Sequence, residues 1–487
     1  MTELLVETAY GPVLGSRAKG VARWLNLPYA RAERFGPPRP PQPWGGTRSA
    51  LEHGPQCPQM YGENARRARL DPDGFSEDCL ALNIYAPEGG EEVGKKPVYV
   101  WIHGGAFVAG SGNPYDGSWM ARLGDVVVVT INYRLGVLGW VNFGEAMGLP
   151  AIPSNLGLRD QIAALEWVRD NIAGFGGDPA RVTIGGQSAG SMSVSLLLHC
   201  RKAWPLFRGA IMQSGALSLI HGRQKSLAVA RRYGEILGVD QSGLERLRSL
   251  PLRALFEAQA QVGRETPGTI PAAPWFDGDL LPGSLEEAIA APTAPVPLLA
   301  GAVRDEIRLF ELMPGDILPS KWPALEALLS DQLGADHAAR VLAAYPRNAA
   351  GRRALATDLT FAMPTRNFAE RHARLSPTWF YRFDYSHPIA GATHGLDLTL
   401  TWPMPGFRAS LARGGAMNGR RQALGERMVG HYAHFVRRLD PGGDWPAYAP
   451  NERSVKIFGL EDRIERNPEA SRFEAWANRD VGPAIAA

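Results

Sequence analysis

The chain contains the stretch Val182-Thr183-Ile184-Gly185-Gly186-Gln187-Ser188-Ala189-Gly190, and this stretch decides how its fold is interpreted. The β-branched run 182–185 predicts a buried strand, and the apolar run 188–199 predicts a helix directly after it. A G-x-S-x-G motif between a strand and a helix is typical of a nucleophile elbow, in which the serine hydroxyl projects from a strained turn. Taken alone, the motif also fits a glycine-rich helix start with Ser188 as its N-cap.

The alternation of strands and helices continues along the chain. Short apolar runs predict further strands at 97–102, 126–132, 210–213, 296–301 and 378–383. Helical periodicity is clearest at 155–173. This order predicts an α/β fold with a mostly parallel central sheet flanked by helices on both faces.

Two long stretches do not fit simple crossovers between strands. Residues 217–294 show helical periodicity at 227–237 and 244–260, and residues 321–373 form a second such stretch. Both exceed the roughly 10–15 residues that a crossover helix needs, so we interpret them as insertions that build a helical cap over the carboxyl ends of the strands. With no repeat or linker in the sequence, we expect one domain over 1–487.

Composition excludes several classes of protein. The 487 residues are 45% hydrophobic and 21% charged, which is ordinary for a globular protein and unlike a disordered one. Lys and Arg number 52 against 49 Asp and Glu, so the balance gives no sign of nucleic-acid binding. Only three cysteines occur, which excludes a disulfide framework.

The start of the chain and its apolar runs suggest a location. Glu3 and Glu7 precede the first basic residue, Arg17, unlike a secretory signal. No apolar run approaches the roughly 20 residues of a membrane-spanning helix. We therefore expect a soluble, cytoplasmic protein that does not contact membranes.

A second motif follows the strand predicted at 97–102. The sequence His103-Gly104-Gly105-Ala106-Phe107 stands where an oxyanion loop belongs relative to the elbow. Its backbone N–H groups, together with that of Ala189, are expected to converge on a tetrahedral oxyanion. The alternative is a tight glycine turn in which His103 only packs.

A nucleophilic serine also needs a base and an acid, and the sequence offers two candidates for each. In folds with such an elbow the chain order is serine, acid, histidine. Glu306 follows one predicted strand, and His394 lies in a glycine-rich loop after another. Position alone leaves Asp305 and His387 as open alternatives.

Signals for metals and nucleotides are weak. His431 and His434 are three residues apart on a predicted helix, but no H-E-x-x-H or cysteine pair accompanies them, so ordinary surface or packing histidines are favoured. The glycine run 104–112 lacks the lysine of a phosphate loop. We expect no metal and no cofactor, and a small molecule as the partner.

At this point the motifs carry a family resemblance. The run 175–190, which contains Phe175-Gly176-Gly177-Asp178-Pro179, resembles the active-site signature of the type-B carboxylesterases, the cholinesterase-like branch of the α/β-hydrolases. Residues 76–83 (Ser-Glu-Asp-Cys-Leu-Ala-Leu-Asn) are similar to that family's other signature. Further similar segments lie at 27–35, 103–107, 304–306 and 394–397. Within the family, we expect bacterial carboxylesterases of the para-nitrobenzyl esterase type to be nearest.

The resemblance implies roles for individual residues. It implies Ser188 as nucleophile, Glu306 as acid and His394 as general base. It implies an oxyanion hole of the N–H groups of Gly105, Ala106 and Ala189, with Gly104 shaping the loop.

It also implies several supporting residues. These are an ion pair between Arg34 and Glu77, a possible disulfide between Cys57 and Cys79, and a serine near the histidine at Ser214. The chain departs from the family at Gln187, where a glutamate is usual, and at Ile307, where the family has glycine. These departures bear on pocket shape and substrate range.

The implied activity is hydrolysis of small or medium apolar or aryl esters through an acyl-enzyme. An amidase, a carbamate hydrolase or a hydrolase of polyester oligomers with the same triad is the alternative, and a non-catalytic binding protein on this fold is a more distant one. The sequence leaves open a monomer or a small homo-oligomer. Aromatic candidates for an apolar pocket, each of which also fits simple core packing, are Phe107, Trp119, Phe276, Phe310 and Trp402.

Overall fold

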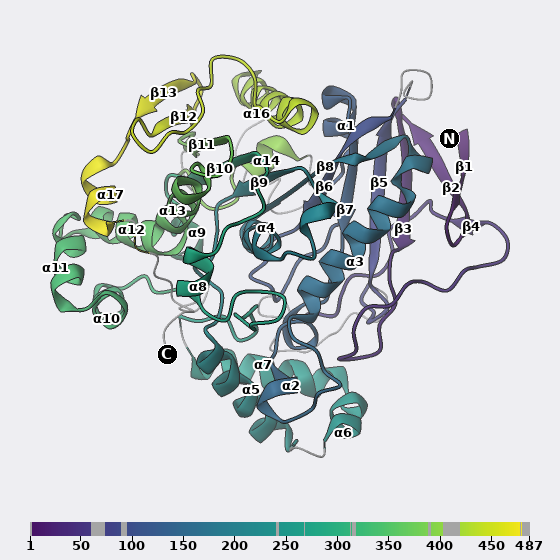
Figure 1. The fold of residues 1–487 in the computed structure, drawn as a ribbon, viewed down its shortest axis with the longest axis horizontal. Coiled ribbons are helices and arrows are strands. Elements are labelled where there is room, and N and C mark those ends of the chain that lie inside the picture. Colours follow the sequence, from purple (N-terminus) through teal and green to yellow (C-terminus); the bar gives the residue numbers. More distant parts are fainter. Residues whose placement is uncertain are drawn as a thin grey trace.

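The computed structural model describes residues 2–59, 74–88, 95–239, 243–266, 268–311, 313, 318–387, 391–402, 419–477 and 479. Within these residues, the strands form one sheet with the order β1-β2-β3-β5-β7-β6-β8-β9-β10-β11-β12-β13, and β4 pairs with β2 (Figure 1). The strands are Thr2–Thr8 (β1), Gly11–Ala18 (β2), Val21–Pro28 (β3), Arg48–Ser49 (β4), Ala81–Pro87 (β5), Lys96–Ile102 (β6), Val127–Ile131 (β7), Gly177–Gln187 (β8), Gly209–Gln213 (β9), Leu298–Val303 (β10), Thr378–Phe383 (β11), Ser454–Phe458 (β12) and Arg463–Arg466 (β13).

The middle of this sheet is parallel and its edges are antiparallel. Neighbouring strands from β7 through β6, β8, β9, β10 and β11 to β12 run parallel. The pairs of β1 with β2, β2 with β3, β3 with β5, β5 with β7 and β12 with β13 are antiparallel. The predicted α/β-hydrolase fold, with a mostly parallel sheet and flanking helices, is therefore confirmed, and each of the six strands expected from the sequence is present.

Helices occupy most of the connections. They are Ser118–Gly124 (α1), Phe143–Ala146 (α2), Leu156–Asn171 (α3), Ala189–His199 (α4), Arg223–Leu237 (α5), Leu244–Ser249 (α6), Leu252–Glu265 (α7), Leu285–Ala290 (α8), Arg308–Glu311 (α9), Trp322–Leu333 (α10), Ala335–Ala343 (α11), Ala349–Thr357 (α12), Met363–His372 (α13), Leu398–Thr401 (α14), Gly419–Arg438 (α16) and Ala470–Trp476 (α17). A π-helical turn, Asp358–Ala362 (η5), joins α12 to α13. The periodic run 244–260 is divided into α6 and α7 because Pro251, which lacks an N–H group, stands between them.

The core lies in two layers, one on each face of the sheet, and β6 shows how the sequence fills both. Val98, Val100 and Ile102 of β6 belong to one buried cluster, which includes α3 and α4. Tyr99 and Trp101, which alternate with them, belong to the other, which includes α1 and α16. Because successive side chains of a strand point to opposite faces, a strand that is apolar throughout must be covered on both sides. Burying each large side chain contributes roughly 1.5–3 kcal/mol.

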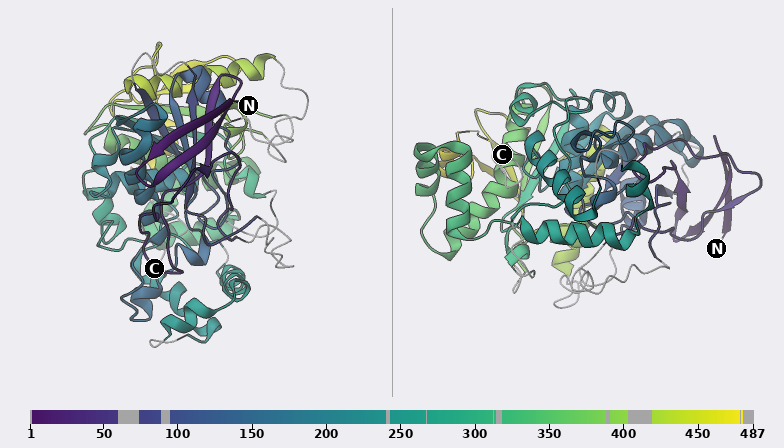
Figure 2. Two further views of the ribbon diagram at one scale, coloured as in Figure 1. Left: turned by 90° about the vertical axis from the view of Figure 1, so that its right-hand side faces the viewer. Right: turned by 90° about the horizontal axis from the view of Figure 1, so that it is seen from below.

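The two long stretches predicted as insertions are helical. Residues 217–294 carry α5 to α8, and residues 321–373 carry α10 to α13 with η5. In Figure 1 α5 to α7 lie below the sheet and α10 to α13 lie on its left, and Figure 2 (right) shows both groups from below. Their interpretation as a cap on one domain over 1–487 stays a prediction. Among the described helices, none is both long and apolar enough to cross a membrane.

Candidate active site

Ser188 occupies a strained turn between β8 and α4. Its φ of 59° and ψ of −126° lie in a region that non-glycine residues rarely adopt and that costs roughly 1–3 kcal/mol. The neighbouring strand β9 holds this turn in place, because the Ser188 N–H donates to the carbonyl oxygen of Gln213 at 2.9 Å. Gly190 packs so closely against the Ile102 carbonyl that a Cβ atom would collide with it. Ser188 is partly exposed while Gln187 and Ala189 are buried, which leaves the serine side chain accessible at the turn.

The loop 103–107 packs directly against this turn. A Cβ atom on Gly104 would lie 3.0 Å from Ser188 Cβ and 2.5 Å from the Gln187 carbonyl oxygen, so only glycine fits there. The N–H groups of Gly104, Gly105, Ala106 and Ala189 make no hydrogen bond to another residue in the described ranges. Gly104 and Ala189 adjoin Ser188, and all four N–H groups remain able to donate to an oxyanion.

His103 supports the loop. The Tyr133 hydroxyl donates to the His103 carbonyl oxygen at 2.7 Å, and the two rings stack with centroids 4.4 Å apart. Burial lowers the pKa of His103 to about 4, so the ring is neutral at pH 7. His103 therefore packs against Tyr133 and supports the loop that carries the donor N–H groups.

His394 lies beside Glu306. The His394 Nδ1 and Glu306 Oε2 atoms are 2.6 Å apart, and Glu306 Oε1 accepts from the Val303 N–H at 2.7 Å. Glu306 is fully buried and His394 is 8% exposed. A buried carboxylate that accepts from Nδ1 fixes the imidazole tautomer and leaves Nε2 as the acceptor.

The two alternative residues lie elsewhere in the same loops. Asp305 is partly exposed, and its Oδ2 accepts from the Arg304 guanidinium at 3.1 Å and from the Ala392 N–H at 3.3 Å. His387 pairs through its backbone with Gly391, three residues before His394. Both residues thus hold the loop that carries His394.

His394 Nε2 is bonded to the side chain of Gln187 rather than to Ser188. The Gln187 Nε2 and His394 Nε2 atoms are 3.0 Å apart. Within the described part of the chain, the Ser188 hydroxyl makes no hydrogen bond. On another side, the rings of Phe361 (η5) and Phe310 (α9) lie 4.5 Å and 5.3 Å from the imidazole. The stretch 321–373, which carries Phe361, therefore reaches His394.

A second buried carboxyl, Asp397, stands behind the pair and had no role in the sequence analysis. Gln213 Nε2 donates to Asp397 Oδ2 at 3.0 Å, and Asp397 is fully buried. Burial, followed by the nearby Glu306 charge, raises the pKa of Asp397 to about 6. Its place three residues after His394, at the end of a motif that the sequence displays, was the available signal. Phe361 gave no such signal because it lies far away in the chain.

The other predicted residues are placed as follows. Ser214 is fully buried, and no hydrogen-bond partner for its hydroxyl lies within the described residues. The predicted ion pair is confirmed, since Arg34 Nε and Nη2 donate to Glu77 Oε2 and Oε1 at 2.8 and 2.5 Å.

The cysteines Cys57 and Cys79 are buried thiols in this structure. A hydrogen bond between them, followed by burial, raises the pKa of Cys79, so the two sulfur atoms are neighbours. A disulfide between them stays a prediction.

The histidines considered as metal ligands on α16 are bound to the backbone. His431 and His434 Nδ1 contact the carbonyl oxygens of Pro441 and Asp440, each at 2.8 Å. In the described residues, no group of three His, Cys, Asp or Glu side chains is arranged to hold a metal ion.

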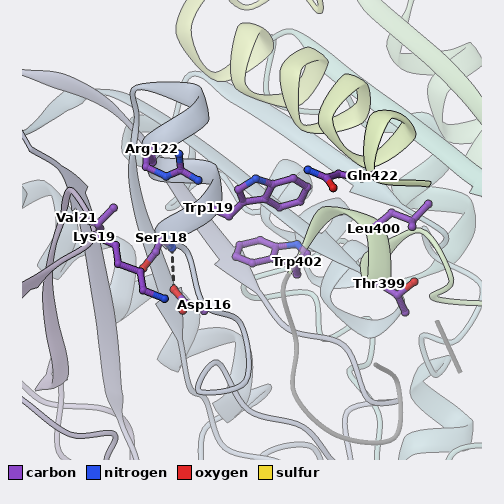
Figure 3. Close-up of a pocket in the computed structure, with 10 residues that line it drawn as sticks. All are labelled: Lys19, Val21, Asp116, Ser118, Trp119, Arg122, Thr399, Leu400, Trp402 and Gln422. Carbon is purple, nitrogen blue, oxygen red and sulfur yellow. Dashed lines mark hydrogen bonds between the residues drawn. The ribbon is translucent and has the colours of Figure 1, made fainter. Parts of the chain in front are cut away.

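A cavity of about 590 Å³ lies away from the serine turn, between α1, α14 and α16 (Figure 3). Trp119 and Trp402, two of the aromatic candidates for a pocket, line it, together with the charged side chains of Lys19, Asp116 and Arg122. Phe107 and Phe276 are instead buried in the core. Neither Ser188 nor His394 lines this cavity, so it is distinct from the candidate active site.

Comparisons with known proteins agree with this arrangement. Residues 2–476 match the carboxylesterase family. The chain is 35% identical to the para-nitrobenzyl esterase of Bacillus subtilis (strain 168), with 97% of this chain and 98% of that protein covered. It is 32% identical to the human cocaine esterase, over 96% of this chain and 90% of the relative.

A solved structure gives the same result in three dimensions. A thermophilic PNB esterase superposes with a TM-score of 0.87 at 34% identity, over 97% of this chain and all of that one. The chain therefore belongs to the carboxylesterase family and is a carboxylic ester hydrolase.

Proposed function

We propose that this protein hydrolyses small or medium apolar or aryl esters through a Ser188–His394–Glu306 triad and an acyl-enzyme. The observation that carries the proposal is the contact of His394 Nδ1 with buried Glu306 at 2.6 Å, beside a serine held in a strained turn. Carboxylate, imidazole and hydroxyl in that chain order are the parts that nucleophilic catalysis by serine requires.

The first half-reaction acylates the serine. The Ser188 oxygen attacks the ester carbonyl carbon while His394 Nε2 accepts the hydroxyl proton. The N–H groups of Gly105, Ala106 and Ala189 donate to the oxyanion, and Gly104 shapes the loop that carries two of them. The C–O bond to the alcohol then breaks, and His394 returns the proton to the departing oxygen.

The second half-reaction frees the enzyme. Water attacks the acyl carbonyl, again losing a proton to His394, and the Ser188–acyl bond breaks with the proton returned to Ser188. Glu306 orients the imidazole and stabilises its charged form in both halves. The aromatic rings of Phe310 and Phe361 exclude water from one side of the base.

The arrangement of the chain is part of the proposal. We infer one catalytic domain over 1–487 in which the stretches 217–294 and 321–373 form the cap that shapes the substrate pocket. The contact of Phe361 with His394 supports this role for the second stretch.

Covalent labelling tests the proposal. Intact-mass spectrometry after exposure to a fluorophosphonate is expected to show one adduct on wild type and none on Ser188→Ala, and p-nitrophenyl ester hydrolysis is expected to disappear with the label. A folded Ser188→Ala protein that hydrolyses esters near the wild-type rate would contradict it.

Matched aryl ester, carbamate and anilide substrates test the leaving group. The chemistry at the carbonyl is shared, and only protonation of the leaving atom and the pocket contacts differ. We expect the ester to be turned over fastest, and a faster carbamate or anilide would replace the ester assignment.

A further inference from the structure

The side chain of Gln187 contacts the one atom of His394 that must change its proton during catalysis. Gln187 ends β8, is 2% exposed, and has its Nε2 atom 3.0 Å from His394 Nε2. A polar group that contacts this atom therefore interacts differently with the neutral imidazole and with the protonated one.

The tautomer decides which group donates. Glu306 accepts from Nδ1 at 2.6 Å, so in the neutral ring Nε2 carries the lone pair. Only the amide NH₂ of Gln187 can donate to that lone pair, because the amide oxygen is an acceptor. When His394 takes a proton, two donors face each other at 3.0 Å, and this hydrogen bond is lost.

We propose that Gln187 is a positioning residue for His394: its amide N–H holds the imidazole in the neutral, Nδ1-protonated state from which it can accept the serine proton. This inference rests on the proposed function, because it assigns a role to the partner of its general base. The same hydrogen bond occupies Nε2 in the substrate-free enzyme, so Ser188 engages the base only as the amide is displaced.

The surrounding charges do not supply this preference. The Glu306 carboxylate lies at Nδ1 and the Asp397 carboxyl stands behind it, and a negative charge does not hold an imidazole in its neutral state. Phe310 and Phe361 cover other sides without charge. Gln187 is therefore the contact that opposes protonation at Nε2.

The test is the acid limb of the kcat/KM profile for a p-nitrophenyl ester. Gln187→Met keeps the length of the side chain and removes the donor, and Gln187→Glu puts a carboxylate at the same atom. We expect the midpoint of the acid limb to lie lowest in wild type, to rise by up to about one pH unit in Gln187→Met, and to rise by roughly one to three units in Gln187→Glu.

The control matches the charge change at a distant site. Gln261→Glu on α7 adds a carboxylate beside Glu265, where Gln261 now donates at 2.9 Å. Its acid limb is expected to coincide with that of wild type. Phosphonate labelling of Ser188 and thermal unfolding are measured on every variant to show an intact site and fold.

The outcomes separate the two proposals. If wild type is labelled and active but Gln187→Met keeps the wild-type acid limb, the role of Gln187 is wrong and the serine mechanism stands. The role of Gln187 is also wrong if the acid limbs of Gln187→Met and Gln187→Glu have the same midpoint. A carboxylate at position 187 would then have no effect on His394 Nε2. If wild type takes no phosphonate, the proposed function itself fails.

Discussion

The ends of β8 and β9 share a Gln-Ser pair in which the serine has a positive φ, yet the two serines have opposite surroundings. Gln187 and Gln213 are register partners, and each is followed by a serine at positive φ, 59° at Ser188 and 56° at Ser214. Ser188 is partly exposed beside the glycine loop, whereas Ser214 is fully buried and its hydroxyl has no partner among the described residues. A positive φ therefore does not by itself make a serine accessible, because the surrounding residues bury Ser214 and leave Ser188 partly exposed.

The two glutamines make the same contrast. Gln187 donates to the imidazole of His394, and Gln213 donates to the carboxylate of Asp397. The glutamines that end these two adjacent strands therefore contact an imidazole and a buried carboxyl. Strand register places both glutamines at the same level of the sheet, and the burial of their partners sets the chemistry there.

The largest expected effect separates the two serines. Ser188→Ala is expected to lower kcat for ester hydrolysis by roughly 10⁴- to 10⁶-fold, by analogy with other serine hydrolases. Ser214→Ala is expected to stay within about tenfold of wild type and not to lower the free energy of unfolding, because it removes a buried hydroxyl without a partner. Steady-state kinetics and denaturant unfolding measure both, and a comparable loss of kcat in the two variants would break the comparison.

The next effect separates two adjacent carboxylates. Glu306→Gln is expected to lower kcat by roughly 10³- to 10⁴-fold, because the amide no longer fixes the tautomer of His394. Asp305→Asn is expected to remain within about tenfold, since Asp305 is partly exposed and its carboxylate contacts Arg304 and the Ala392 N–H group. Kinetics at saturating p-nitrophenyl ester give the ratio, and a reversed order would exchange the two assignments.

A smaller effect is expected at the loop that distinguishes Ser188 from Ser214. A Cβ atom on Gly104 would press on the Gln187 carbonyl oxygen at 2.5 Å, so Gly104→Ala is expected to displace the N–H donors. The loss in kcat should be about 10²- to 10³-fold, the size seen when one oxyanion donor is removed. Gly45→Ala, which meets nothing within 4 Å, is the control. An unchanged kcat in Gly104→Ala would show that the loop is not part of the hole.

The smallest effect concerns Asp397 and is read from stability. Because its pKa rises from 3.8 to about 6 in the folded chain, the protonated acid stabilises the fold below pH 3.8, and this contribution is lost as pH rises through 6. The shift corresponds to roughly 3 kcal/mol. In denaturant unfolding, the free energy of unfolding of Asp397→Asn should therefore increase relative to that of wild type by up to that amount between pH 4 and pH 7. If the difference in free energy of unfolding between Asp397→Asn and wild type did not change with pH, the raised pKa of Asp397 would be wrong.

The sequence predicted the parts of this molecule that depend on local pattern. The six apolar strands and the glycine motifs of the elbow and loop appear where expected, because burial on both faces and tight turns restrict residue type strongly. The antiparallel edge strands, such as β1 and β13, were not predicted. Their residues are partly or fully exposed, so their apolar pattern is weaker. These segments become strands because they pair with a neighbouring strand.

What the sequence did not predict comes from contacts between distant segments. From chain position alone, either Glu306 or Asp305 could be the acid, and only the family resemblance favoured Glu306. The hydrogen bond of Gln187 with His394 spans 207 residues of sequence, and the Phe361 ring comes from a separate insertion. The sequence also suggested Trp119 and Trp402 as residues of an apolar pocket, but the cavity that they line does not include Ser188.

The π turn η5 has a consequence for the phase of its helix. One extra residue in a turn rotates everything beyond it by about 100° relative to an α-helix. With this offset, the Phe361 ring meets His394 while Thr365, one turn later, accepts from the Gly215 N–H at 3.0 Å. Deleting a single residue from 358–362 would restore ideal helical phase and present those two side chains on the wrong sides. The length of this turn, together with the identity of its residues, therefore sets where the side chains of Phe361 and Thr365 lie.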